Sequence, residues 1–103
     1  MKKYNKLVRD RIPDIIKKQG QHPVTRILND SEYVETLIDK LCEEVDEFDE
    51  DRNVEEMADI LEVLMALAQA LGINQKDLLK VRQKKAVTRG SFNKRIFLER
   101  VEE

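Results

Sequence analysis

Residues 32–48, EYVETLIDKLCEEVDEF, decide the fold of this chain. Apolar side chains recur there at spacings of three, four and one, the pattern of one face of an α-helix. Asn29 precedes the stretch, and Glu32 follows Asn29 by three residues, as in a capping box. The pattern therefore predicts a helix that begins near Asn29 or Asp30 and runs to about Glu50. Its apolar residues are Tyr33, Val34, Leu37, Ile38, Leu41, Cys42, Val45 and Phe48.

A second helix is predicted directly after the polar turn DEDRN, from about Val54 to Leu71, with Gly72 as its stop. The short link makes the two helices antiparallel neighbours. The second of them is apolar nearly all round, and such a helix has to be surrounded by other elements. Because 103 residues supply few other helices, we expect part of its surface to pack against a second subunit. The predicted fold is all-α: a small antiparallel helical bundle completed by oligomerisation, as a homodimer or homotetramer.

The flanking segments are less regular. A short helix is predicted through DIIKKQ, with Asp10 as cap, Pro13 in its first turn and Gly20 as its stop. QHPVTRIL has the composition of an extended connector or a short strand. A further helix is predicted from Asn74 towards Val87, with Gly90 ending it, and SFNKRIFLERVEE is either a strand or a docked arm. At this length, residues 1–103 are most simply one domain.

Charge is strongly segregated along the chain although the net charge is only −2. Residues 1–26 hold eight Lys or Arg against two acids, residues 27–62 two against fifteen, and residues 63–103 nine against four. Folding brings basic flanks near an acidic centre, which suits a metal and an anionic ligand better than it suits nucleic acid.

Cysteine usage and hydropathy point to a cytoplasmic protein. The single Cys42 excludes an intramolecular disulfide framework, and we expect it in the core, with His22 in a loop. No segment is long and apolar enough for a signal peptide or a membrane span, so no membrane association is expected.

Three carboxylates stand at helix positions where a simple amphipathic design has apolar side chains, and others flank them. On a helical wheel Glu44 falls inside the apolar arc of the first long helix, with Glu47 and Glu43 at its margin. In the next helix Glu56 and Asp59 fall among apolar positions. Each pair is spaced i,i+3, and the antiparallel turn brings the pairs together, so Glu44, Glu47, Glu56 and Asp59 are predicted to form a metal-binding cage, with Glu43 as a fifth candidate. Asp46, Asp49, Glu50 and Asp51 have the positions of solvated acids.

A divalent cation removes the repulsion between carboxylates in a partly dry site. Oxygen-only ligands select hard ions, so Mg²⁺ is expected first and Mn²⁺ second. Mg²⁺ keeps several waters and binds phosphate oxygens, which makes a nucleotide the expected substrate.

The sequence EEVDE followed by EMAD resembles the Glu-Glu-x-x-Glu and Glu-x-x-Asp signature of the all-α MazG-like nucleoside triphosphate pyrophosphohydrolases, relatives of phosphoribosyl-ATP pyrophosphohydrolase. YNKLVRDRIPDII and KKAVTRGSF also resemble the flanking motifs of a small branch of that superfamily. These motifs together cover the chain almost end to end.

The resemblance implies Mg²⁺-dependent hydrolysis of the α–β phosphate linkage of a nucleotide to a monophosphate and pyrophosphate, with house-cleaning of non-standard nucleotides as one role. It implies that Glu44, Glu47, Glu56 and Asp59 hold the metal and that a glutamate, Glu44 or Glu47, helps to deprotonate water. Which one is the base stays open. The candidate phosphate-binding cations are Lys6, Arg9, Arg11, Lys40, Lys85 and Arg89.

Only eight residues separate Glu47 from Glu56, fewer than is usual in the superfamily. Base selectivity is therefore expected to be weak or to come from another subunit. The alternative interpretation is a non-catalytic helical module that binds a partner or senses a nucleotide, because the apolar second long helix fits that function equally well.

Overall fold

A computed structural model describes residues 2–103, and within them the chain forms four α-helices and no strand. The helices are α1 (Ile12–Lys18), α2 (Asp30–Asp51), α3 (Val54–Ala70) and α4 (Gln75–Arg89). The all-α prediction is confirmed. The QHPVTRIL segment is an extended connector, and the tail after α4 has no regular secondary structure.

The start of α2 is the predicted capping box. Asn29 Oδ1 accepts a hydrogen bond from the Glu32 backbone N–H at 2.8 Å, and Glu32 Oε1 accepts one from the Asn29 backbone N–H at 3.2 Å. These bonds satisfy backbone donors that the first turn of a helix leaves free. Local sequence chemistry is therefore sufficient to begin the longest helix of the chain.

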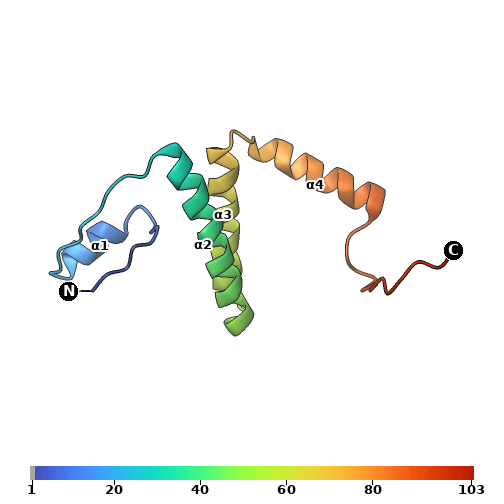
Figure 1. Ribbon diagram of the computed structural model, residues 1–103, viewed down its shortest axis with the longest axis horizontal. Helices are drawn as coiled ribbons and strands as arrows, with labels where there is room; N and C mark the ends of the chain where they lie inside the picture. The colour runs from blue at the N-terminus through green and yellow to red at the C-terminus, as the bar shows by residue number, and fades with distance from the viewer. Residues whose placement is uncertain (1) are drawn as a thin grey trace.

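A two-residue link joins α2 to α3 and makes them an antiparallel hairpin (Figure 1). Arg52 adopts a left-handed conformation with φ 49°, and its N–H donates to the Phe48 carbonyl at 2.6 Å. The Arg52 guanidinium also bonds Asp49 at 2.8 Å. The next residue, Asn53, caps α3 by accepting from the Glu56 N–H at 2.9 Å. The tight turn sets the first turn of α3 beside the last turns of α2.

One predicted helix start needs correction, and another is confirmed. Asp10 does not cap α1: Arg11 occupies the cap position without a side-chain hydrogen bond, and the Ile12 N–H bonds the Arg9 carbonyl at 3.1 Å instead. A backbone turn thus takes the donor that Asp10 was expected to satisfy. Asn74 does cap α4, through the Lys76 N–H at 2.8 Å. The helix runs to Arg89 and ends at Gly90, as predicted.

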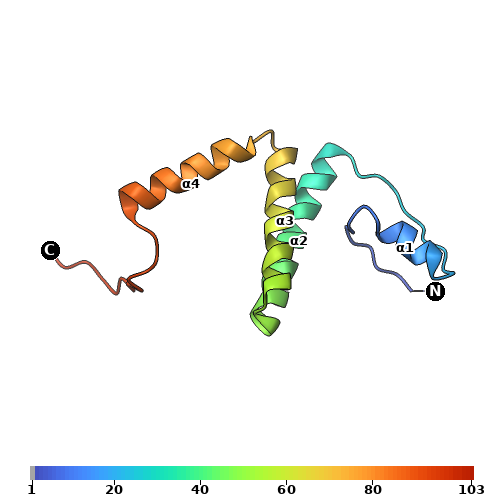
Figure 2. The ribbon, with the colours of Figure 1, turned by 180° about the vertical axis from the view of Figure 1, so that it is seen from behind.

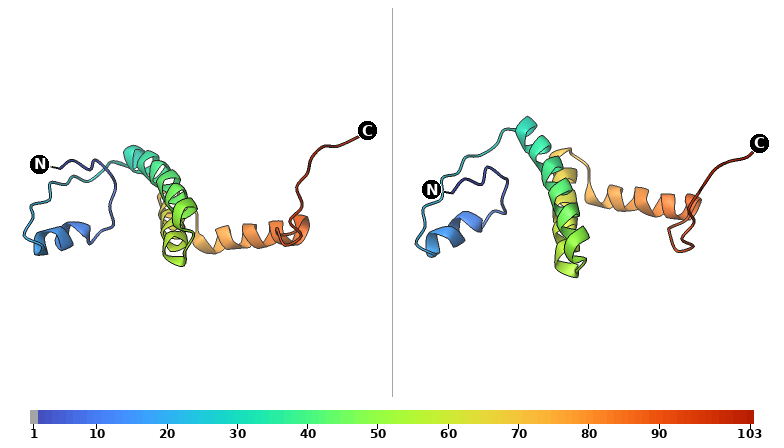
Figure 3. Two further views of the ribbon diagram at one scale, coloured as in Figure 1. Left: turned by 90° about the horizontal axis from the view of Figure 1, so that it is seen from below. Right: turned by 60° about the horizontal axis from the view of Figure 1, so that its bottom comes forward.

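The arrangement around the hairpin is open. α1 and the N-terminal segment lie on one side of α2 and α3, whereas α4 leads away on the other side to the C-terminus (Figures 1 and 2). Views from below and from an intermediate angle show the same separation (Figure 3). The chain measures 64 × 31 × 25 Å along its principal axes.

The buried apolar residues are few: Leu37 on α2, and Val63 and Ala68 on α3. Cys42 is exposed, so its predicted place in the core is wrong. It lies at the edge of the apolar arc of α2, on the side where Ile38 and Val45 are also exposed, because α3 covers the other side of that arc. His22 is exposed in the connector, as expected.

Candidate functional site

Glu44 is the buried charged residue of the hairpin. It is 6% exposed, on the face of α2 that packs against α3, as the helical wheel predicted. One carboxylate oxygen, Oε1, lies 3.3 Å from the Nζ of Lys40 one turn earlier. The other oxygen, Oε2, is buried without a hydrogen-bond partner. Burying a carboxylate oxygen without a partner costs free energy, and a bound cation or an added hydrogen-bond donor at this position would remove that cost.

The first turn of α3 brings a second such oxygen to the same place. Glu56 stands three residues after its cap Asn53, where a glutamate often returns to the cap, as Glu32 does at α2. No such bond forms at α3. The Glu56 Oε2 is instead buried without a partner. Both helices begin with an Asn cap and a glutamate three residues later, but only the glutamate of α2, Glu32, bonds back to its cap.

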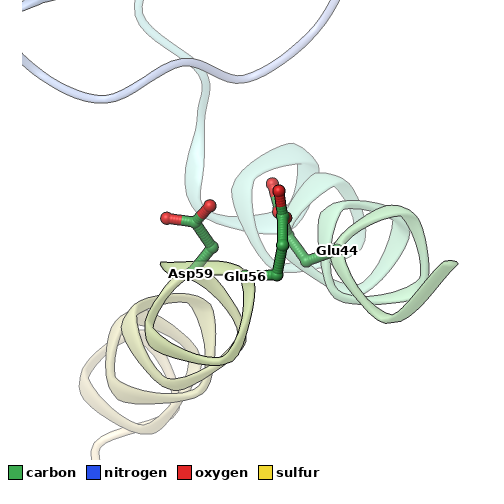
Figure 4. A group of neighbouring side chains, drawn as sticks. All are labelled: Glu44, Glu56 and Asp59. Carbon is green, nitrogen blue, oxygen red and sulfur yellow. The ribbon is translucent and has the colours of Figure 1, made fainter. Parts of the chain in front are cut away.

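Glu44, Glu56 and Asp59 form a compact cluster, which we call the acidic cluster. One carboxylate oxygen of each lies within 4.8 Å of the others. Figure 4 shows the Glu44 and Glu56 carboxylates side by side, reaching out of the hairpin in the same direction, with the Asp59 carboxylate next to them on α3. Carboxylate oxygens are ligands of the type that hard ions such as Mg²⁺ or Mn²⁺ prefer.

Cations from two parts of the chain border the acidic cluster. Arg9 of the N-terminal segment donates to Asp59 Oδ1 at 2.6 Å. Lys40, only 20% exposed, bridges Glu44 and Glu43, while Lys6 lies 3.8 Å from Glu43. The predicted cations Lys6, Arg9 and Lys40 are therefore brought to the site, and Glu43 is paired with lysines at its margin.

The electrostatics of the site disfavour negative charge. Burial raises the pKa of Glu56, and the neighbouring Asp59 charge raises it further. The Glu44 charge raises the pKa of Glu47, with burial as the second cause. Both shifts have the direction expected where carboxylates crowd together without enough positive charge.

Glu47 lies at the edge of the site. It is exposed and outside the compact group of three carboxylates, although the charge of Glu44 acts on it. The i,i+3 spacing put it on the correct side of α2. What the spacing could not give is its distance from α3, which depends on how closely the two helices approach.

The remaining predicted cations are placed elsewhere. Arg11 lines a shallow pocket at α1 with Asp14, Ile15 and Lys18. Lys85 and Arg89 are exposed on α4, the helix that leads away from the hairpin (Figure 1). Among residues 2–103, no ion pair joins either of them to the acidic cluster.

Comparison with known proteins gives one partial relative. Over 41 residues the chain is 56% identical to an uncharacterized protein of Mycolicibacterium smegmatis. The matched segment is 40% of this chain and 42% of that protein. The chain thus matches less than half of that relative's length. No protein-family model and no solved structure match the chain. None of the helices within residues 2–103 is long and apolar enough to cross a membrane.

Proposed function

We propose that the chain is a Mg²⁺-dependent nucleotide pyrophosphohydrolase of the MazG-like type, acting in the cytoplasm as a homodimer or homotetramer. It cleaves the α–β phosphate linkage of a nucleoside triphosphate or related nucleotide, giving a monophosphate and pyrophosphate. Removal of non-standard nucleotides is one role that fits this reaction. The observation that carries the proposal is the pair of buried, unpartnered oxygens, Glu44 Oε2 and Glu56 Oε2, in one acidic cluster with Asp59.

The donor set of the acidic cluster fits a divalent ion. Lys40 reaches only one oxygen of Glu44, and Arg9 reaches only Asp59, which leaves Glu56 without a counter-charge among the ion pairs of residues 2–103. A hard dication supplies that charge, and carboxylate oxygens are the ligands it prefers. Mg²⁺ is the first choice and Mn²⁺ the substitute.

The residues then take distinct roles. Glu44, Glu56 and Asp59 would hold the ion, which when bound neutralises phosphate charge and makes water easier to deprotonate. Glu47, exposed beside the three ligands, is available to accept a proton from water, so we assign it as the general base in preference to Glu44. Lys6, which lies near Glu43, and Arg9, which binds Asp59, border the acidic cluster and can bind phosphate oxygens.

A panel of nucleoside triphosphates tests the proposal. Purified protein with Mg²⁺ should release pyrophosphate from at least one of them, and a Glu44→Gln, Glu56→Gln double variant should not. The matched control is Asp46→Asn, Glu50→Gln, which removes the same number of charges from exposed positions of α2. Equal pyrophosphate release by the wild type and the Glu44, Glu56 variant would reject the function.

The alternative, a non-catalytic module for a protein partner, is favoured by the many exposed apolar side chains of α3 and α4. Metal distinguishes the two. If neither Mg²⁺ nor Mn²⁺ binds by calorimetry or raises the thermal midpoint, the acidic cluster is not a metal site and the partner-binding module is preferred.

A further inference from the structure

The hairpin leaves an apolar face uncovered. Along α3, one row of apolar side chains follows the spacings of a helix face and is 38% to 74% exposed. We call this row the α3 stripe; it consists of Val54, Met57, Leu61, Leu64 and Met65. A continuous row of this kind on a helix marks a surface that packs against something else.

The solvent-accessible surface area of the chain is larger than that of a compact monomer of the same mass. A folded monomer of 12.1 kDa exposes about 6,000 Å², whereas this chain exposes 9998 Å². Its radius of gyration is 18.4 Å, against about 13 Å for a compact domain of this length. The excess is about 4,000 Å² for each chain and so about 8,000 Å² for a pair, which is more than the roughly 2,000–5,000 Å² in total that most obligate homodimers bury.

The part of the chain that projects from the hairpin carries the matching chemistry. We call residues 75–103, that is α4 and the tail, the arm. Arg82, Lys85 and Arg89 follow Leu78 at spacings of four, three and four, so they share one face of α4. Beyond α4 the tail presents apolar side chains that are 73% to 96% exposed: Phe92, Ile96, Phe97 and Leu98.

The arm and the hairpin are thus complementary in charge and in hydrophobicity. The arm offers a cationic face and an apolar end, while the hairpin offers the acidic cluster and the α3 stripe. Because every copy carries an arm and a hairpin, the arm of each copy can bind the hairpin of the other in a symmetric, reciprocal contact. Within one chain the arm leads away from the hairpin (Figures 1 and 3).

We propose that two copies of this chain exchange their arms, so that each arm packs on the α2–α3 hairpin of the other copy and brings Arg82, Lys85 and Arg89 to its acidic cluster. In this arrangement the apolar tail covers the α3 stripe of the second copy. The exchange explains why cations predicted to serve the site stand so far from it in their own chain.

The consequence for the site rests on the proposed function. The guanidinium and ammonium groups of the second copy would then bind the phosphate oxygens of a nucleotide whose metal is held by the first copy. A lone chain would hold metal but lack the phosphate-binding cations of the arm.

Cross-linking of isotope-mixed protein tests the exchange without metal or nucleotide. Equal amounts of ¹⁴N- and ¹⁵N-labelled chains are unfolded together, refolded and treated with a zero-length carbodiimide that joins lysine to carboxylate. About half of the cross-links between Lys85 and the acids of α2 or α3 should join a light to a heavy chain. Sedimentation of the same sample should give a mass of two chains or a multiple of two.

Two results would overturn the proposal: a monomer in sedimentation, or Lys85 cross-links confined to chains of one isotope, which would mean that the arm folds back on its own hairpin. Neither bears on the metal site. Conversely, a failure of Mg²⁺ to bind leaves the exchange standing.

Charge reversal adds a matched pair of variants. Lys85→Glu, Arg89→Glu should weaken the dimer roughly tenfold or more, because like charges then face each other across the contact. Lys17→Glu, Lys18→Glu makes the same change on exposed α1 and should leave the dimer unchanged. Equal dimer affinities for the two variants would argue against the arm as the contact.

Complementation links the exchange to the site. Neither Glu44→Gln nor Lys85→Ala, Arg89→Ala should release pyrophosphate at the wild-type rate alone. When the two are refolded together, half of the dimers are mixed and each has one intact site, so about a quarter of wild-type activity should return. If the arms served their own chain, the mixture would show no recovery.

Discussion

The guanidinium of Arg9 lies 2.6 Å from the carboxylate of Asp59, fifty positions further along the chain. This ion pair ties the N-terminal segment to α3 at the border of the acidic cluster. Both side chains keep much of their exposure, so the pair contributes little to stability and serves chiefly to place a cation beside the candidate metal ligands.

Substitution of Arg9 separates these two effects. Arg9→Gln should change the free energy of unfolding by less than about 1 kcal/mol, because exposed ion pairs are weak. It should lower kcat/KM for the nucleotide by roughly 10-fold to 100-fold, the loss expected when a charged hydrogen bond to phosphate is removed. Urea unfolding and steady-state kinetics give the two numbers. Lys17→Gln on α1 is the control, and an equal kinetic loss there would contradict a specific role for Arg9.

Metal binding should stabilise the wild type but not a variant without Glu44. At a Mg²⁺ concentration 100 times the dissociation constant, the wild type should gain about 2.7 kcal/mol in free energy of unfolding. Glu44→Gln should lose this gain, because it removes one carboxylate of the acidic cluster and with it a buried oxygen that no donor reaches. Denaturant titrations with Mg²⁺ and with chelator measure both effects. A gain of equal size in the variant would show that Mg²⁺ binds elsewhere.

The pH dependence of the metal-free protein follows from two raised pKa values. Burial raises the pKa of Glu56 above its ordinary value of 4.5, and the Glu44 charge raises that of Glu47. A carboxyl with a raised pKa holds its proton more tightly when the chain is folded. Its contribution to stability is therefore fully present below pH 4.5 and is lost as the pH rises through the raised pKa.

In chelator, Glu56→Gln should accordingly lose less stability than the wild type as the pH rises from 4.5. Glu32 is the control of opposite sign: Arg26 lowers its pKa, so its contribution is present above pH 4.5 and is lost as the pH falls through the lowered value. Urea unfolding at a series of pH values measures these slopes. If the free energy of unfolding changed with pH in the same way for the wild type and Glu56→Gln, the pKa of Glu56 would not be raised by burial and by neighbouring carboxylates.

The cap of α3 should matter for both stability and metal. Asn53→Ala removes the acceptor of the Glu56 N–H and should cost about 1 kcal/mol of stability. Because that bond sets the first turn of α3, it should also weaken Mg²⁺ binding. Asn29→Ala removes the cap of α2 at a comparable cost, far from the acidic cluster, and should leave Mg²⁺ affinity unchanged. Thermal unfolding and calorimetry of both variants test this, and equal metal affinities would disconnect the cap from the site.

Helix limits and the choice of face could be predicted from the sequence. The asparagines before α2, α3 and α4 and the glycines after α3 and α4 mark where these helices begin and end, because their hydrogen bonds and backbone conformations are local. Periodicity also placed Glu44 on the packed face of α2. The limits of a helix and the face on which each residue lies are determined by residues within that helix and at its ends.

The composition of the site was predicted only in part. Glu44, Glu56 and Asp59 come together as expected, whereas Glu47 lies at the edge and Glu43 is paired with Lys6 and Lys40. A helical wheel gives the direction of a side chain around its axis. It does not give the rotamer of that side chain or its distance from the next helix, and these decide which carboxylates meet.

The sequence by itself thus determined the helices, their antiparallel pairing and the carboxylate on the apolar stripe, because each depends on residues within a few turns of one another. Only the tertiary structure decided that Arg9 contacts Asp59, that the Glu56 carboxylate lies beside Glu44 instead of bonding back to Asn53, and that α4 carries Lys85 and Arg89 away from the hairpin. These relationships depend on how segments remote in sequence pack and on the path of the chain after a turn. No local periodicity encodes either.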